Sequence, residues 1–125
     1  MRFKHFTYKE FDCKSGKGNG ENMDNKFIDM LDKAREKAGI PFIITSGYRT
    51  NEYNQYLIDS GYKGSATSSH LKGVASDIEA KTSEQRYKII TALLDVGATR
   101  IGIGKNFIHV DTDIRKIQNL IWTYY

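Results

Sequence analysis

Two histidines and one aspartate have residue types and spacing that suit a catalytic metal site. His70 and Asp77 belong to one segment, Ser-Ser-His-Leu-Lys-Gly-Val-Ala-Ser-Asp, and His109 stands later, in Phe-Ile-His-Val-Asp. Imidazole nitrogen and carboxylate oxygen are ligands that zinc accepts, and three protein ligands leave a fourth tetrahedral position for water. If these side chains meet in space, the chemistry that they offer is hydrolysis by an activated water.

Strand periodicity explains how two of these residues can meet. The segments 74–80 and 107–112 are predicted to be β-strands, and side chains alternate between the two faces of a strand. Asp77 on one strand and His109 on its neighbour can then point into the same cleft. The small side chain of Ala75 leaves room over the sheet for a metal ion and its water.

Helical and strand patterns alternate along the rest of the chain. Apolar residues recur at three- and four-residue steps in the predicted helices, and β-branched runs mark the predicted strands. We expect helices over 7–11, 22–38, 51–59 and 83–97, and strands over 42–45, 74–80, 100–104, 107–112 and 117–125. Residues 14–21 are glycine-rich, but they lack the context of a phosphate-binding loop. These patterns predict one α+β domain over 1–125, with helices packed around a central antiparallel sheet.

Composition limits the class of protein. The chain has 125 residues, of which 39% are hydrophobic and 27% are charged, as in a soluble globular protein. The single cysteine, Cys13, excludes an internal disulfide. There is no apolar run near the roughly 18 residues of a membrane span and no signal-peptide pattern at the start. We therefore expect a monomer without a membrane partner, made in the cytoplasm.

The net charge of +4, with a pI near 9.1, favours polyanionic partners. Nucleic acid and an anionic cell wall are both candidates, and a role in solubility alone is the plain alternative. Because the sequence has no basic helix, zinc-finger spacing or aromatic-basic RNA motif, we expect no nucleic-acid partner.

The motif residues resemble a known family. Ser-x-His-x-x-Gly-x-Ala-x-Asp at 68–77, His-Val-Asp at 109–111 and Ser-Gly-Tyr-Arg at 46–49 are similar to segments of the zinc D-Ala-D-Ala carboxypeptidases. That family includes phage endolysins and other peptidoglycan peptidases with a hedgehog-type fold. The resemblance implies Zn²⁺ held by His70, Asp77 and His109.

The resemblance also implies residues that bind substrate. Arg49 would bind a carboxylate or carbonyl of the peptide, since a guanidinium grips a carboxylate with two hydrogen bonds. An ordinary salt bridge is the alternative for Arg49. Ser68 is expected either to hydrogen-bond substrate or to cap its loop, and Tyr48 either to contact substrate or to pack.

The chain departs from the family pattern at the general base. Asn106, Phe107 and Gly104 occupy the positions where better-studied members have a glutamate or histidine, and none of these three takes up a proton at neutral pH. Two carboxylates remain on the predicted metal-facing sides of the strands, Asp111 and Glu79. Asp111 is the preferred catalytic acid, with a supporting contact to His109 or Arg49 as its alternative.

These observations predict a zinc peptidase that cleaves peptidoglycan stem peptides, as a carboxypeptidase or as an endopeptidase. Two other functions stay open. The chain can be a zinc-containing module that binds peptidoglycan without hydrolysis, or a structural component of a virion. Small size, basic charge and the missing signal peptide suit a phage lysis or entry enzyme that acts on the cell wall.

Overall fold

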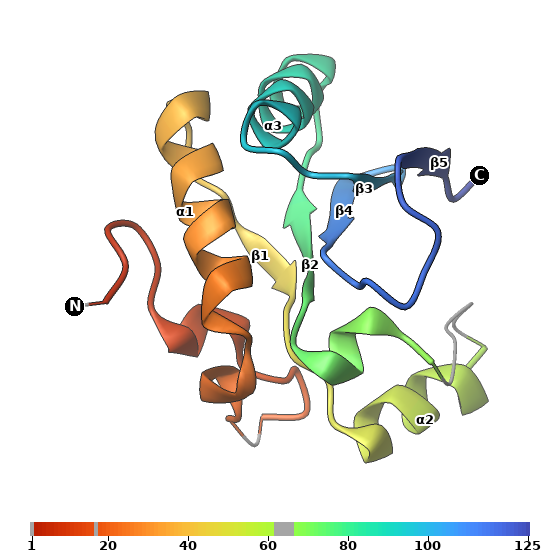
Figure 1. Cartoon of the computed structure of the whole chain (residues 1–125). Helices are drawn as coiled ribbons and strands as arrows, with labels where there is room; N and C mark the ends of the chain where they lie inside the picture. Colours follow the sequence, from red (N-terminus) through yellow and green to blue (C-terminus); the bar gives the residue numbers. More distant parts are fainter. Residues whose placement is uncertain (1, 17, 62–66) are drawn as a thin grey trace.

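A mixed β-sheet carries the strands on which the candidate metal ligands lie. The computed structural model describes residues 2–16, 18–61 and 67–125 (Figure 1). In these residues the sheet has five strands in the order β1-β2-β4-β3-β5. The strands are β1 (Ile44–Ser46), β2 (Ala75–Glu79), β3 (Arg100–Ile103), β4 (Phe107–Asp111) and β5 (Leu120–Thr123). The fold is α+β, as the sequence predicts.

Helices and short 3-10 turns connect the strands. The α-helices are α1 (Asn25–Ala38), α2 (Asn51–Asp59) and α3 (Ser83–Asp95), and the 3-10 turns are η1 (Tyr8–Phe11), η2 (Gly20–Asn22) and η3 (Ser69–Lys72). Figure 1 shows α1 and α3 side by side along the sheet, with α2 beyond its lower end. The predicted first helix is thus a single 3-10 turn, and His70 lies in η3.

The ends of the helices follow local hydrogen bonds. The Asp24 carboxylate accepts a hydrogen bond from the Phe27 amide, so α1 begins at Asn25 and not at residue 22 as predicted. Gly39 ends this helix in a left-handed conformation, with a φ of 70°. Thr82 and Gln85 form a capping box that starts α3.

The two faces of the sheet differ in chemistry because side chains alternate along each strand. Ile78 of β2 and Ile108 of β4 pair across the strands and are fully buried, as is Val110. These residues belong to the core that also contains the buried faces of α1 and α3. Asp77 and His109, which are also direct partners, project from the opposite face. One sheet therefore separates an apolar core from a polar site.

The core draws on distant parts of the chain. Its largest fully buried side chains are Phe6, Phe11, Phe27, Phe42, Ile28, Leu31, Ile78, Ile89, Leu93, Ile101, Ile108 and Val110. The N-terminal segment therefore contributes to the same apolar core as the strands.

The last strand corrects one prediction. β1, β2, β4 and β3 are joined by antiparallel pairs, but β5 pairs with β3 in parallel. Since β3 and β4 form a hairpin, the segment after β4 must cross to the far side of β3, where β5 then runs in the direction of β3. The sheet is consequently mixed and not purely antiparallel.

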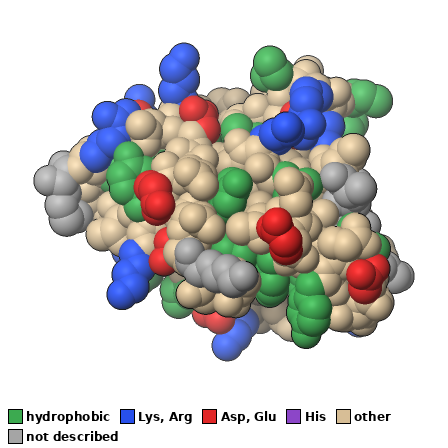
Figure 2. Space-filling model, turned by 90° about the horizontal axis from the view of Figure 1, so that it is seen from below, with side chains coloured by type: hydrophobic (Ala, Val, Ile, Leu, Met, Phe, Trp, Pro, Cys, Tyr) green, Lys and Arg blue, Asp and Glu red, His purple; other side chains and the backbone are tan. Residues whose placement is uncertain are grey.

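The surface mixes side-chain types. Seen from below in Figure 2, apolar, basic and acidic side chains form small groups among other residue types. Within the part of the chain that the structure describes, no helix has the length and apolar character required to cross a bilayer.

Candidate metal centre and adjoining cleft

The three predicted metal ligands come together on the polar face of the sheet. One ligand atom from each of His70, Asp77 and His109 lies within 4.8 Å of the other two, and all three residues are buried. His109 Nδ1 is 2.8 Å from Asp77 Oδ1, and His70 Nε2 is 3.5 Å from the same oxygen. This arrangement gives two nitrogens and one carboxylate directed at a common point.

Each imidazole is oriented by a hydrogen bond at its other nitrogen. His70 Nδ1 lies 2.8 Å from the carbonyl oxygen of Gly47, and His109 Nε2 lies 2.8 Å from Asp111 Oδ2. An acceptor at one ring nitrogen favours the tautomer in which the other nitrogen keeps its lone pair. The contacts therefore present His70 Nε2 and His109 Nδ1 as ligand atoms, as outer partners do in metal sites.

Local backbone geometry brings His70 to the sheet. The Ser68 hydroxyl accepts a hydrogen bond from the His70 amide at 3.3 Å and caps η3. Gly73 ends this turn with a φ of 70°, and a Cβ there would lie 2.6 Å from the Asn22 carbonyl oxygen. A glycine is thus required where the chain turns back into β2. Of the two alternatives for Ser68, the structure shows the capping contact.

Asp111 is held among several donors. Its Oδ1 accepts hydrogen bonds from Arg100 Nε at 2.7 Å and from the Asp113 amide at 3.1 Å, while Oδ2 faces His109. Asp111 therefore contacts His109 and pairs with Arg100 rather than with Arg49. Arg100 was not among the predicted site residues, although it lies in the predicted strand next to the His-Val-Asp strand.

Buried charges shift the ionisation of the site. Burial lowers the pKa of His70. Burial opposes the charge on Asp77 too, but hydrogen bonds from His109 and His70 outweigh it and lower the pKa of Asp77. Burial also disfavours protonated His109, but the carboxylates of Asp111 and Asp77 outweigh that effect and raise its pKa. The carboxylates thus favour a cation at the centre of the cluster.

An aromatic wall borders the cluster on the β5 side. Gly102 of β3 pairs with His109 on one side and with Trp122 on the other. The Trp122 ring lies 5.6 Å from the His109 ring, and the Tyr124 ring lies 6.2 Å from it, between centroids. The Arg100 guanidinium lies over the indole at 4.8 Å. Trp122 and Tyr124 were not predicted at the site, because their place there depends on the parallel pairing of β5 with β3.

A cleft of about 270 Å³ adjoins the cluster and shares Asp77 with it. Its lining residues are Lys14, Thr45, Ser46, Arg49, Tyr53, Leu57, Asp77 and Phe107. Arg49 Nε donates to Ser46 Oγ at 3.2 Å, and its Nη2 lies 3.9 Å from Asp77 Oδ2. The predicted substrate-binding arginine is therefore buried at the junction of the cleft and the metal cluster.

The other predicted site residues lie at different places. Tyr48 packs against the apolar core, which is the packing alternative of the sequence analysis. Glu79 shares the polar face of β2 with Asp77, is partly exposed, and has its Oε1 3.4 Å from Lys81 Nζ. Asn106 lies in the turn of the β3–β4 hairpin, where its carbonyl accepts a hydrogen bond from the Ala80 amide.

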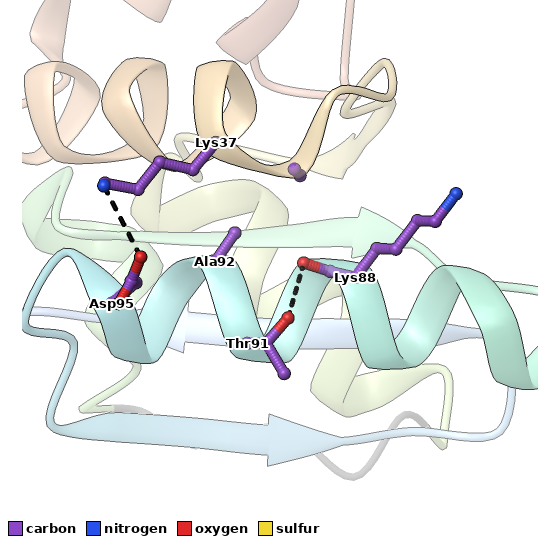
Figure 3. A pocket seen from close by; sticks show the side chains of 6 residues that line it. Lys37, Lys88, Thr91, Ala92 and Asp95 are labelled. Atoms are coloured by element: carbon purple, nitrogen blue, oxygen red, sulfur yellow. Dashed lines mark hydrogen bonds and ion pairs between the residues drawn. The ribbon is translucent and has the colours of Figure 1, made fainter.

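A second groove, between α1 and α3, differs from this cleft in its chemistry (Figure 3). Lys37 extends from α1 to Asp95 of α3, with a nitrogen–oxygen distance of 3.4 Å, and the Thr91 hydroxyl donates to the Lys88 carbonyl. Its described lining residues include no imidazole, and its cations are paired with acids. The groove lies between two helices, and its described lining residues offer no ligand set for a metal.

Comparisons with known proteins agree with this fold. A D-alanyl-D-alanine carboxypeptidase of Enterococcus faecalis is 28% identical over 85% of this chain and 48% of its own length, so the chain spans about half of that relative. The crystal structure of the Serratia marcescens L-Ala D-Glu endopeptidase ChiX superposes with a TM-score of 0.62 at 17% identity, over 76% of this chain and 84% of that one. The family model described as Peptidase M15 matches residues 4–111. The chain therefore belongs to the Peptidase M15 family.

Proposed function

We propose that this chain is a zinc-dependent peptidase that hydrolyses peptidoglycan stem peptides. The observation that carries the proposal is the buried convergence of His70, Asp77 and His109, with ligand atoms within 4.8 Å of one another. Their donor set matches zinc, and the outer contacts from Gly47 and Asp111 leave one nitrogen of each imidazole for the metal.

The metal and the protein would divide the chemistry. Zinc, when bound, supplies Lewis-acid activation of water and of the scissile carbonyl. Arg49 binds a carboxylate or carbonyl of the peptide from the wall of the cleft. Asp111 orients His109, since both of its oxygens already accept hydrogen bonds within the protein.

The proton acceptor is assigned by position. Asp111 and Glu79 are the two acids predicted for this role, and Asp111 is fully engaged by its donors. Glu79 lies two residues from Asp77 on the same face of β2, a separation of about 7 Å along a strand, and is partly exposed. We therefore assign Glu79 as the acceptor, acting through water. Glu79→Gln should lower kcat more than 100-fold while zinc content stays unchanged.

The reaction can be tested directly with purified peptides. Zinc-loaded protein should cleave muropeptides, lose activity with a chelator and regain it when zinc is restored. Mass spectrometry of the products separates D-alanine release from cleavage within the stem, the two activities after which the relatives are named. His5→Ala, which removes a histidine paired with Glu36 outside the site, is the control for His70→Ala.

A second function is favoured by one observation. Asn106, Phe107 and Gly104 place no proton acceptor at the end of β3 or the start of β4. A module that binds peptidoglycan through zinc without cleaving it would bind muropeptides in calorimetry and show no turnover. Retention of the fold only for virion assembly predicts a protein without zinc, which elemental analysis detects. For the peptidase and for the binding module, we propose a monomer that acts at the cell wall, with phage lysis or entry as its setting.

A further inference from the structure

We propose that Lys14 determines substrate specificity by binding a second carboxylate of the peptide. The proposal rests on the peptidase function given above and adds a requirement for a peptide that has two carboxylates. Lys14 and Arg49 come from segments far apart in the sequence, yet both line the cleft that adjoins Asp77.

Close packing fixes the position of the segment that carries Lys14. A Cβ at Gly47 would lie 2.7 Å from both the Cα and the carbonyl oxygen of Phe11, so the segments around these residues are in direct contact. A second contact follows a few residues later in both segments, where Cys13 Sγ lies 4.0 Å from Thr50 Oγ1. The start of the glycine-rich loop is therefore attached to the chain on either side of Arg49.

A turn then directs the lysine to the cleft. The Gly16 amide donates to the Cys13 carbonyl at 3.1 Å, and the Cys13 amide donates to the Gly18 carbonyl at 2.9 Å. Lys14 lies inside this hydrogen-bonded turn, and its side chain is exposed at the rim of the cleft. A lysine at a rim costs little to desolvate, so it is suited to a carboxylate that enters from solvent.

The charge and shape of the cleft indicate an acidic peptide. Among the lining residues that the structure describes, the cations are Lys14 and Arg49, and the one carboxylate is Asp77, which a bound metal would neutralise. Tyr53 and Phe107 supply apolar contact for short side chains. Lys14 at the rim and Arg49 at the inner end of the cleft match a peptide with two carboxylates. A chain end supplies one of them, and a glutamyl residue supplies the other because it leaves one carboxylate outside its peptide bond.

The test compares two synthetic stem peptides that differ only at the glutamyl carboxylate, which is free in one and amidated in the other. The variants are Lys14→Gln and the conservative Lys14→Arg. Lys9→Gln is the matched control, because Lys9 is an exposed lysine of the same N-terminal region outside the cleft. The readouts are KM and kcat for both peptides, together with calorimetric Kd values for the same pair.

The wild type should prefer the free acid by about fivefold in KM and Kd, as expected for one solvent-accessible ion pair. Lys14→Gln should remove this preference by weakening the binding of the free-acid peptide alone, with kcat unchanged. Lys14→Arg and Lys9→Gln should keep the preference. Equal preference in wild type and Lys14→Gln would overturn the proposal. If no peptide is cleaved, the peptidase function fails, and the Kd comparison still decides the role of Lys14.

Discussion

Gly102 and Trp122 are partners across β3 and β5, and the indole fills the space that a side chain at Gly102 would need. A Cβ on Gly102 would lie 2.8 Å from both Cε2 and Nε1 of Trp122, and 2.7 Å from a ring carbon of Tyr124. The same glycine faces His109 on its other side. The absence of a side chain therefore allows the aromatic wall to reach the metal cluster.

The first prediction concerns this close contact. Gly102→Ala should displace Trp122 and lower the free energy of unfolding by about 1–3 kcal/mol, because the added methyl overpacks the site. Trp122 is the only tryptophan, so its emission maximum reports the displacement directly. The control is Ile121→Ala, on the exposed opposite face of β5. An unchanged emission maximum in Gly102→Ala would contradict the packing described.

The second prediction uses the same tryptophan to detect metal. Co²⁺, which occupies zinc sites and quenches nearby fluorophores, should quench Trp122, whose ring lies 5.6 Å from the His109 ring. His109→Ala and Asp77→Asn should abolish saturable quenching, because each removes one of three ligands. In His5→Ala, Co²⁺ should quench Trp122 as it does in the wild type. Saturable quenching that survives in Asp77→Asn would place the metal elsewhere.

The third prediction concerns the carboxylate behind His109. Asp111→Asn should weaken zinc binding about 10- to 100-fold, since it weakens the hydrogen bond that orients the imidazole. Competition with a chromogenic chelator measures this affinity. Asp95→Asn, which removes an exposed acid paired with Lys37, is the control and should leave zinc affinity unchanged. Equal affinities in the two variants would show that Asp111 has no orienting role.

The sequence predicted the local part of this structure well. The helix over 51–59 agrees with α2, and the strands that carry Asp77 and His109 lie within their predicted ranges. Both elements are set by short-range interactions, since the Thr50 hydroxyl accepts a hydrogen bond from the Tyr53 amide at the start of α2 and apolar side chains alternate along the strands. The convergence of the three ligands was likewise expected from a motif and from strand periodicity.

These short-range signals do not specify which strands pair over long distances in the sequence. The parallel β3–β5 contact depends on where the chain crosses after β4, and no residue pattern encodes that path. Trp122 and Tyr124 could not be assigned to the site for this reason, whereas the Arg100–Asp111 pair spans the local β3–β4 hairpin. The predicted strand over 42–45 is also shifted, since Ile43 is exposed and β1 begins at Ile44.

The fourth prediction concerns acid stability near η3. Asp113 is buried, accepts a hydrogen bond from the Ser69 hydroxyl at 2.7 Å and forms an ion pair with Arg115 at 2.7 Å. The bonds from Arg115, followed by the one from Ser69, lower the pKa of Asp113 even though burial opposes this. A carboxylate whose pKa is lower in the folded protein stabilises the fold above its unfolded pKa of about 3.9 and loses this effect as the pH falls towards the folded value.

Asp113→Asn should therefore lower the free energy of unfolding by about 1–3 kcal/mol at pH 7. The difference from the wild type should shrink as the pH falls below about 4. Urea unfolding at pH 7 and pH 3 measures both values. Glu84→Gln, in the exposed pair with Lys88, should stay within about 0.5 kcal/mol of the wild type at pH 7. A cost for Asp113→Asn that is the same at both pH values would mean that the Asp113 charge does not stabilise the fold.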